Sequence, residues 1–179
     1  MEAVIHLASN RPCTQNEQYR SYYTSNLKDE TLAAGASVEH KNVLLIPLVG
    51  DIFTTQRLSP GQAQLTSKEI TVTNPYEEEL VNYLVIETHL LIDGIIDFEF
   101  DQNELTILFP GIYIGKYDGR RDDVLRTETK NALVFIIAGA FEVQNRLLEP
   151  RDGLELSEVT EIEFEALSNE AILLIVDVP

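Results

Sequence analysis

Apolar residues occur in short runs separated by turn residues, and no sustained 3.6-residue period of an amphipathic helix accompanies them. The clearest region is residues 133–178. It contains an apolar run ending at Gly139, a second strand to Val143, a proline turn, an alternating strand over 161–165 and a closing apolar run. Runs of this length between turn signals are typical of β-strands. We therefore predict that this region is all β.

An earlier part of the chain repeats the same order. The apolar run 43–49 leads to Gly50, a short strand, the Ser59-Pro60-Gly61 turn and a closing strand ending near Ile86. Gly50 and Gly139 are 89 residues apart, and Pro60 and Pro150 are 90 apart. A nearly constant offset indicates two copies of one β unit. Short strands with frequent turns then predict two tandem jelly-roll or β-barrel lobes, and we place them at residues 1–90 and 91–179.

Three local features refine this picture. Pro47 interrupts an otherwise buried run and cannot donate to a β-ladder, which predicts a sheet edge or a bulge there. Residues 28–37 are mostly small or polar and are expected to be a link. The segment Tyr117-Asp-Gly-Arg120 carries the Asp-Gly signal of a tight hairpin.

The chain is strongly acidic, and this limits its partners. It has 13 Lys and Arg against 30 Asp and Glu, a formal net charge of −17. Nucleic acids and anionic membrane surfaces are recognised through Lys and Arg, so neither is an expected partner. Cys13 is the one cysteine, which excludes a disulfide or a cysteine-based zinc site within one chain. No signal peptide and no run of roughly 18 apolar residues is present, so we expect a cytoplasmic protein.

The few basic residues are unevenly spread. Lys116, Arg120, Arg121 and Arg126 fall close together around the predicted hairpin, with Asp118, Asp122 and Asp123 among them. One interpretation is a solvated hairpin with balanced charges. The other is a patch that binds an anion or an acidic partner.

The amino-acid sequence of the C-terminal region resembles that of a known family. Gly139-Ala-Phe-Glu-Val-Gln-Asn-Arg-Leu-Leu-Glu-Pro-Arg-Asp-Gly153, followed by residues 163–174, resembles the C-terminal half of pirin-like bicupin proteins, the half related to the C-terminal cupin domain of quercetinase-like pirins. Arg20-Ser-Tyr-Tyr-Thr-Ser-Asn26 is similar to the Arg-Ser-Tyr-His-Thr-Phe-Asn segment of the family. The resemblance implies a compact all-β bicupin, with a degenerate N-terminal cupin lobe before a pirin-like C-terminal lobe.

The resemblance also implies where a metal would be held. In the family, the N-terminal cupin binds iron or another divalent metal through three His and one Glu, and some members have quercetin 2,3-dioxygenase activity. Counted back from Gly50, the motif positions are Ala36, Val38 and Asn42, which lack the required donors. The family's third residue of Ser-Tyr-His-Thr is Tyr23 here. We therefore expect no metal, no other cofactor and no catalytic residues.

The remaining residues suggest no other chemistry. The same count in the second lobe gives Leu125, Thr127 and Asn131, and the three histidines, at positions 6, 40 and 89, suggest no cluster. There is no P-loop, Rossmann glycine pattern or Gly-x-Ser-x-Gly motif.

The leading hypothesis is a non-catalytic, metal-free bicupin that binds an unknown small molecule or protein. Asn42 and Tyr23 would line a ligand site in the first lobe. The enzymatic alternative is a quercetinase-like dioxygenase with a displaced ligand set built from His40, Asp51 or Glu residues. A third hypothesis is a docking module that uses the basic segment Lys116–Arg126. The chain is expected to be a monomer or a homodimer, since exposed strand edges allow self-association.

Overall fold

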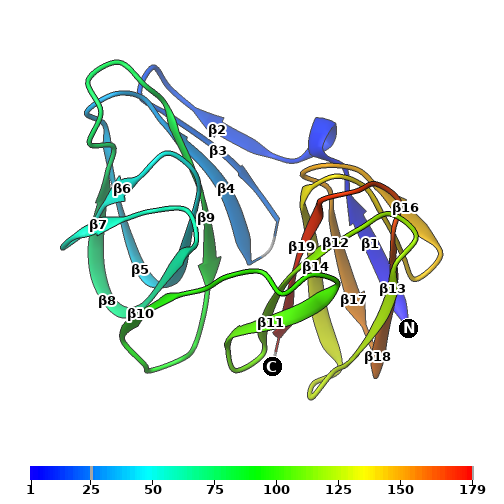
Figure 1. Cartoon of the computed structure of the whole chain (residues 1–179). Coiled ribbons are helices and arrows are strands. Elements are labelled where there is room, and N and C mark those ends of the chain that lie inside the picture. The colour runs from blue at the N-terminus through cyan, green and yellow to red at the C-terminus, as the bar shows by residue number, and fades with distance from the viewer. Residues whose placement is uncertain (25, 179) are drawn as a thin grey trace. The chain divides into compact units, whose positions relative to one another are not determined.

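The structure, a computed structural model, describes residues 1–24 and 26–178, and Figure 1 shows its β architecture. Every regular element in these residues is a β-strand except the short 3-10 helix Ala8–Asn10. The all-β prediction is confirmed. Among the described residues, no helix is long and apolar enough to cross a membrane.

The chain forms two compact units, Arg11–Phe98 and a second unit that joins Met1–Asn10 to Glu99–Pro179. These borders differ from the predicted 1–90 and 91–179. The first border lies later because β10 (Gly94–Asp97) pairs with β8 (Gln62–Thr73) in the first unit. The N-terminal residues belong to the second unit because β1 (Glu2–His6) pairs with β17 (Gly153–Ser157).

The first unit is one curved sheet in the order β2-β3-β4-β9-β5-β8-β6-β7, with β10 added to β8. Its remaining strands are β2 (Cys13–Gln15), β3 (Tyr19–Tyr23), β4 (Leu27–Leu32), β5 (Ser37–Val49), β6 (Ile52–Phe53), β7 (Arg57–Leu58) and β9 (Val81–Glu87). The predicted link over residues 28–37 is therefore wrong, because most of β4 lies in it. This strand was not predicted because the Lys-Asp-Glu sequence at its centre has low intrinsic β-propensity.

The long strand β5 contains two irregularities that shape the barrel. One register shift lies between Lys41 and Val43, where Asn42 has a positive φ of 55°. The other lies between Pro47 and Val49 in the pairing with β9. The bulge predicted at Pro47 is confirmed, although β5 is an interior strand between β9 and β8 and not an edge. The bulges let one strand serve two parts of the curved sheet.

The second unit contains a six-stranded sheet, β1-β17-β14-β19-β12-β11, and a four-stranded sheet, β13-β18-β15-β16. The strands not yet given are β11 (Glu104–Phe109), β12 (Ile112–Tyr117), β13 (Asp122–Arg126), β14 (Asn131–Ala138), β15 (Phe141–Val143), β16 (Arg146–Leu148), β18 (Glu161–Ala166) and β19 (Ala171–Val178). The Asp-Gly segment joins β12 to β13, which belong to different sheets. The predicted tight hairpin is therefore wrong, and the segment is a turn between two sheets.

The internal repeat is visible in the backbone. Gly50 follows β5 with a φ of 71°, and Gly139 follows β14 with a φ of 72°. Both glycines then lead into short strands, β6 and β15. This left-handed conformation strongly favours glycine, which explains why the residue recurs at the same place in both copies.

Candidate functional site

The family motif positions fall around the start of β5 in the first barrel. Ala36 is buried, Val38 is half-buried, and neither carries a donor atom. Asn42 is exposed at the β5 bulge, where its backbone oxygen accepts a hydrogen bond from the Thr88 amide. These three residues do not fit a metal. The Tyr23 side chain lies outside the described part of the structure, and ligand binding by Asn42 and Tyr23 stays a prediction.

The interior of the first barrel instead holds a cluster of polar side chains around Glu30. This residue is fully buried on β4, and the strand register places it between Ser21 on β3 and Tyr83 on β9. Because side chains in one row of a sheet point to the same face, these three residues meet inside the barrel. We call Glu30, His40, Tyr83, Tyr19 and Ser21 the Glu30 cluster.

His40 reaches this cluster from the other part of the curved sheet. The first half of β5, up to Lys41, pairs with β8, whereas the residues after the bulge pair with both β8 and β9. Ala36 and His40 are buried while Ser37 and Glu39 between them are exposed. The alternation puts His40 on the inward face, two residues beyond Val38. Its Nε2 lies 3.1 Å from Glu30 Oε2 and 3.2 Å from the Tyr83 hydroxyl.

The Glu30 carboxylate has its acceptor positions filled. Oε1 accepts from the Tyr19 hydroxyl at 2.7 Å and from the Ser21 hydroxyl at 3.3 Å. Oε2 accepts from the Tyr83 hydroxyl at 2.7 Å and lies in contact with His40. A carboxylate has about four lone-pair positions, and these four donors occupy them in this structure. Since Tyr83 gives its one proton to Glu30, the His40–Tyr83 contact requires the proton on Nε2 of His40.

The electrostatics of the cluster favour a charged carboxylate. Burial by itself raises the pKa of Glu30, but the hydrogen bond and charge of His40, with hydrogen bonds from Tyr19 and Tyr83, bring the pKa below its usual value. Burial, together with the nearby Glu30, raises the pKa of the Tyr83 and Tyr19 hydroxyls. Both hydroxyls therefore stay protonated and donate. The geometry is that of a structural charge held by fixed donors.

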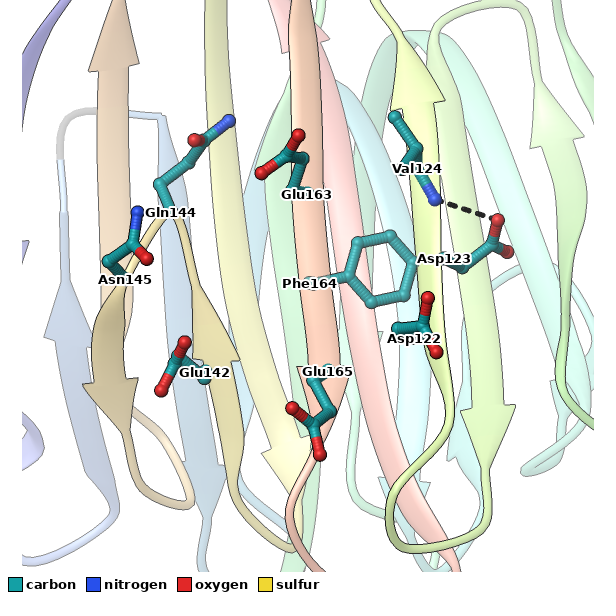
Figure 2. Close-up of a pocket in the computed structure, with 9 residues that line it drawn as sticks. All are labelled: Asp122, Asp123, Val124, Glu142, Gln144, Asn145, Glu163, Phe164 and Glu165. Carbon is teal, nitrogen blue, oxygen red and sulfur yellow. Dashed lines mark hydrogen bonds between the residues drawn. The ribbon is translucent and has the colours of Figure 1, made fainter.

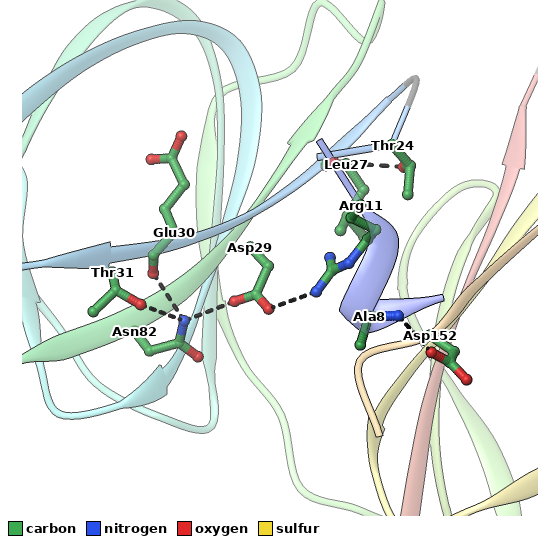
Figure 3. A network of polar contacts seen from close by, with 9 residues as sticks. All are labelled: Ala8, Arg11, Thr24, Leu27, Asp29, Glu30, Thr31, Asn82 and Asp152. Atoms are coloured by element: carbon green, nitrogen blue, oxygen red, sulfur yellow. Dashed lines mark hydrogen bonds and ion pairs between the residues drawn. The ribbon is translucent and has the colours of Figure 1, made fainter. Parts of the chain in front are cut away.

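A second polar network lies on the opposite face of β4, as Figure 3 shows. Asp29 is adjacent to Glu30 in the strand and so points the other way. Its Oδ2 lies 3.2 Å from the Arg11 guanidinium, which also lies 5.5 Å from the centre of the Tyr22 ring. Asn82 on β9 donates to Asp29 Oδ1 at 2.7 Å. Both faces of β4 are therefore covered, and this explains how so polar a strand is buried.

Sequence reasoning missed the Glu30 cluster. It found no histidine cluster, named His40 only as a candidate ligand of the enzymatic alternative, and did not single out Glu30. The one local signal is that Glu30 lies two residues before Leu32, the spacing of side chains on one face of a strand. This spacing does not show which residues contact Glu30. His6 lies beside Glu155 in the second unit, and His89 is exposed. Among the described residues no group of three His, Cys, Asp or Glu is arranged to hold a metal, so a displaced ligand set is not favoured.

The predicted basic patch lies on the second unit and has carboxylates beside it. Lys116 contacts Glu170, and Arg120 Nη1 lies 3.6 Å from Glu165 Oε1. Arg126 pairs with Glu161 in the β13–β18 register, whereas Arg121 is exposed. A role of this basic patch in binding a partner stays a prediction.

An acidic hollow of about 260 Å³ lies on the four-stranded sheet, and Figure 2 shows its side chains. In the register, Glu165 on β18 lies between Asp122 on β13 and Glu142 on β15. Like charges opposite one another in a sheet are unfavourable. A row of three carboxylates thus crosses this sheet. The hollow is lined by Asp122, Asp123, Val124, Glu142, Gln144, Asn145, Glu163, Phe164 and Glu165.

Known proteins resemble the chain in fold along its whole length. Bacterial pirin YhhW from Escherichia coli in complex with nickel(II) has a TM-score of 0.80 at 15% identity, over 99% of this chain and 99% of that chain. YhaK from Escherichia coli has a TM-score of 0.67 at 15% identity, over 99% and 94%. Quercetin 2,3-dioxygenase from Acinetobacter baumannii has a TM-score of 0.66 at 13% identity, over 100% and 86%. A search of curated protein sequences finds no match to the chain.

The family comparison concerns the second unit. The profile of the quercetinase C-terminal cupin domain matches residues 112–178, from the start of β12 to the end of β19. This agrees with the resemblance seen in the sequence around Gly139–Gly153. Residues 112–178 are thus similar to the quercetinase C-terminal cupin domain, and the chain as a whole shares the fold of bacterial pirin YhhW and of the quercetin 2,3-dioxygenase.

Proposed function

We propose that the chain is a non-catalytic, metal-free pirin-like bicupin that acts as a binding or protein-interaction module. The observation that carries this proposal is the state of Glu30, whose four acceptor positions are all used by neighbouring side chains. Ala36 and Val38 at the motif positions add no donors. The first barrel thus has a buried carboxylate and a histidine, both engaged in internal contacts.

The packing of the first barrel supports a protein partner over a small molecule. Glu30 and Tyr83 are fully buried, and His40 is 8% exposed. Around them an apolar cluster that includes Leu32, Val72 and Val85 is buried as well. Ligand sites are concave spaces with free polar groups, whereas here the polar groups bind one another. The net charge of −17 makes a partner with a basic surface more favourable than a nucleic acid or an anionic membrane. The cytoplasm remains the predicted location.

Metal content tests the first part of the proposal. The protein is purified without chelator, incubated with nickel(II) or iron(II), desalted and measured by elemental analysis, with Escherichia coli YhhW treated in parallel. We expect far less than one metal per chain and stoichiometric nickel in YhhW. One tightly held iron, nickel, copper or zinc per chain would overturn the proposal.

Oxygen uptake tests the second part. The protein is mixed with quercetin and added divalent metal, and oxygen consumption is followed against metal and flavonol without protein. We expect the two rates to agree, because the motif positions supply no metal ligands. Protein-dependent turnover that is proportional to enzyme concentration would show a catalytic protein.

A further inference from the structure

The strand β1 is an unusual edge among the described sheets. Edge strands are commonly blunted by short length, charge, proline or a bulge, because an open edge pairs with other chains. Here β2, β7, β10 and β16 have two to four residues each. Strand β13 begins with two aspartates and ends with Arg126, and β11 has a bulge between Ile107 and Phe109. Strand β1 has five residues in regular register with β17, contains no Lys, Arg or Pro, and carries one carboxylate, Glu2, at its first position.

The exposed side chains of this edge are mostly apolar. Met1 is 59% exposed, Val4 54%, and Ile5 and Leu7 43% each. Val4 lies on the face with Glu2 and His6. Ala3 lies on the other face, where it packs against the apolar core of the second unit, and Ile5 and Leu7 continue that face. Both faces of the edge therefore offer apolar area for a further strand to cover.

Two copies of this segment, placed antiparallel, have compatible side chains opposite each other. About a centre at Val4, Glu2 stands opposite His6 and Ala3 opposite Ile5, while Met1 stands opposite Leu7. An antiparallel pair of strands related by a two-fold axis has this arrangement, in which one residue meets its own copy. Across the pair, the Glu2 carboxylate can accept a hydrogen bond from the His6 ring, and the apolar residues meet apolar residues.

We propose that two copies of the chain associate through an antiparallel β1–β1 pairing centred on Val4. The six-stranded sheets of the two copies join into one continuous sheet. Glu2 of each chain comes beside His6 of the other, which already lies 3.1 Å from Glu155 of its own chain. Ile5 of each chain extends the apolar face next to Ala3 of the other. Each copy carries a charge of −17, so added salt screens the repulsion between copies and strengthens the dimer.

Sedimentation velocity over a range of protein and salt concentrations tests the pairing. We expect a species of twice the 20.2 kDa chain mass, whose population rises with protein concentration and with salt. The variant Val4→Lys places two like charges opposite each other at the axis, and it should weaken the dimer by about tenfold or more. Ile107→Lys, on the other edge of the same sheet, is the matched control. Its residue is 65% exposed, and the dimer should be unchanged.

A crosslink tests the register. In a Cys13→Ser background, Val4→Cys puts a thiol opposite its copy, and mild oxidation should give a covalent dimer on a non-reducing gel. Glu2→Cys faces His6, so it should crosslink far less. Circular dichroism shows whether each variant is folded. The proposal is overturned if the parent chain is monomeric at all concentrations, if Val4→Lys dimerises like the control, or if the two cysteine variants crosslink equally.

Discussion

The two barrels differ in where their charged side chains lie. In the first, Glu30 and His40 lie within the core beside Tyr83, surrounded by apolar residues. In the second, the central cluster is apolar and includes Phe141 and Phe164 in edge-to-face contact at 6.2 Å. The buried carboxylates of the second barrel, Asp152 and Asp177, are not part of this cluster and accept hydrogen bonds from backbone amides. Other carboxylates of this barrel line the acidic hollow on the four-stranded sheet. The same fold therefore tolerates two kinds of interior.

The comparison shows what holds a buried charge in place. A core must be filled at high density, and a charged group inside it must be paired and hydrogen-bonded. The first barrel meets both needs, because Glu30 has four partners from β3, β5 and β9. In the second barrel, Asp152 and Asp177 are satisfied mainly by backbone amides, and no such group of side chains surrounds a carboxylate within the apolar cluster of its described residues. Substitution of one core residue should therefore lower the free energy of unfolding for different reasons in the two barrels: a lost hydrogen-bonded charge in the first, and lost apolar packing in the second.

The largest expected effect is removal of the buried carboxylate. Glu30→Ala leaves His40 and the hydroxyls of Tyr19 and Tyr83 without their acceptor inside the core. We expect a loss of about 3–5 kcal/mol in the free energy of unfolding of the first barrel, measured by urea denaturation with circular dichroism. Glu39→Ala, at an exposed position of β5, should stay within about 0.5 kcal/mol.

A combined variant sharpens this comparison. Glu30→Leu with His40→Leu and Tyr83→Phe gives the first barrel an apolar interior like that of the second. Replacement of a whole buried ion pair by apolar residues is often neutral or stabilising, so most of the loss in Glu30→Ala should be regained. If the combined variant is as unstable as Glu30→Ala, the cluster is not an independent unit.

An intermediate effect is expected from pH. The pKa of Glu30 is lowered in the folded protein, so its stabilising contribution is complete above the unfolded pKa of about 4.3 and is lost as pH falls through the folded-state pKa. At neutral pH, Glu30→Gln should cost about 2 kcal/mol, and the difference from the parent chain should shrink below about pH 4.

The second barrel provides the control for this pH series. Phe141→Leu changes a fully buried residue whose aromatic neighbours are Tyr117 and Phe164. Its cost should remain constant over the same pH range. A Glu30→Gln difference that is also constant with pH would show that Glu30 is not charged in the folded protein.

The smallest effect concerns the outer face of the second barrel. Glu142→Lys replaces one of the like charges that stand in register with Glu165. We expect a gain of about 0.2–1 kcal/mol in the free energy of unfolding at low salt, and a smaller gain at high salt. Glu17→Lys, the same change on an exposed loop of the first unit, is the control. Equal gains from both variants would mean that net charge, and not the cross-strand row, is responsible.

The fold was largely predictable, and particular residues show why. The spacing of Gly50 and Gly139 identified the repeat because each glycine has a positive φ at the same place in its barrel. Pro47 predicted a bulge because a proline cannot donate to the ladder. Strand β4 was missed, since its Lys-Asp-Glu centre is buried only with partners on β3, β5 and β9. Strand β1 was assigned to the wrong lobe, because its partner β17 begins about 150 residues later.

The all-β class, the duplication and the lack of metal donors at Ala36 and Val38 follow from the amino-acid sequence, since periodicity, turn chemistry and donor atoms are local properties. What fills the first barrel depends on strand pairing. Glu30 and Tyr83 are 53 residues apart in the chain, and they meet only because β4 and β9 pair in one register. Strand pairing also determines which strand lies at a sheet edge, because an edge strand is one that has a partner on one side only.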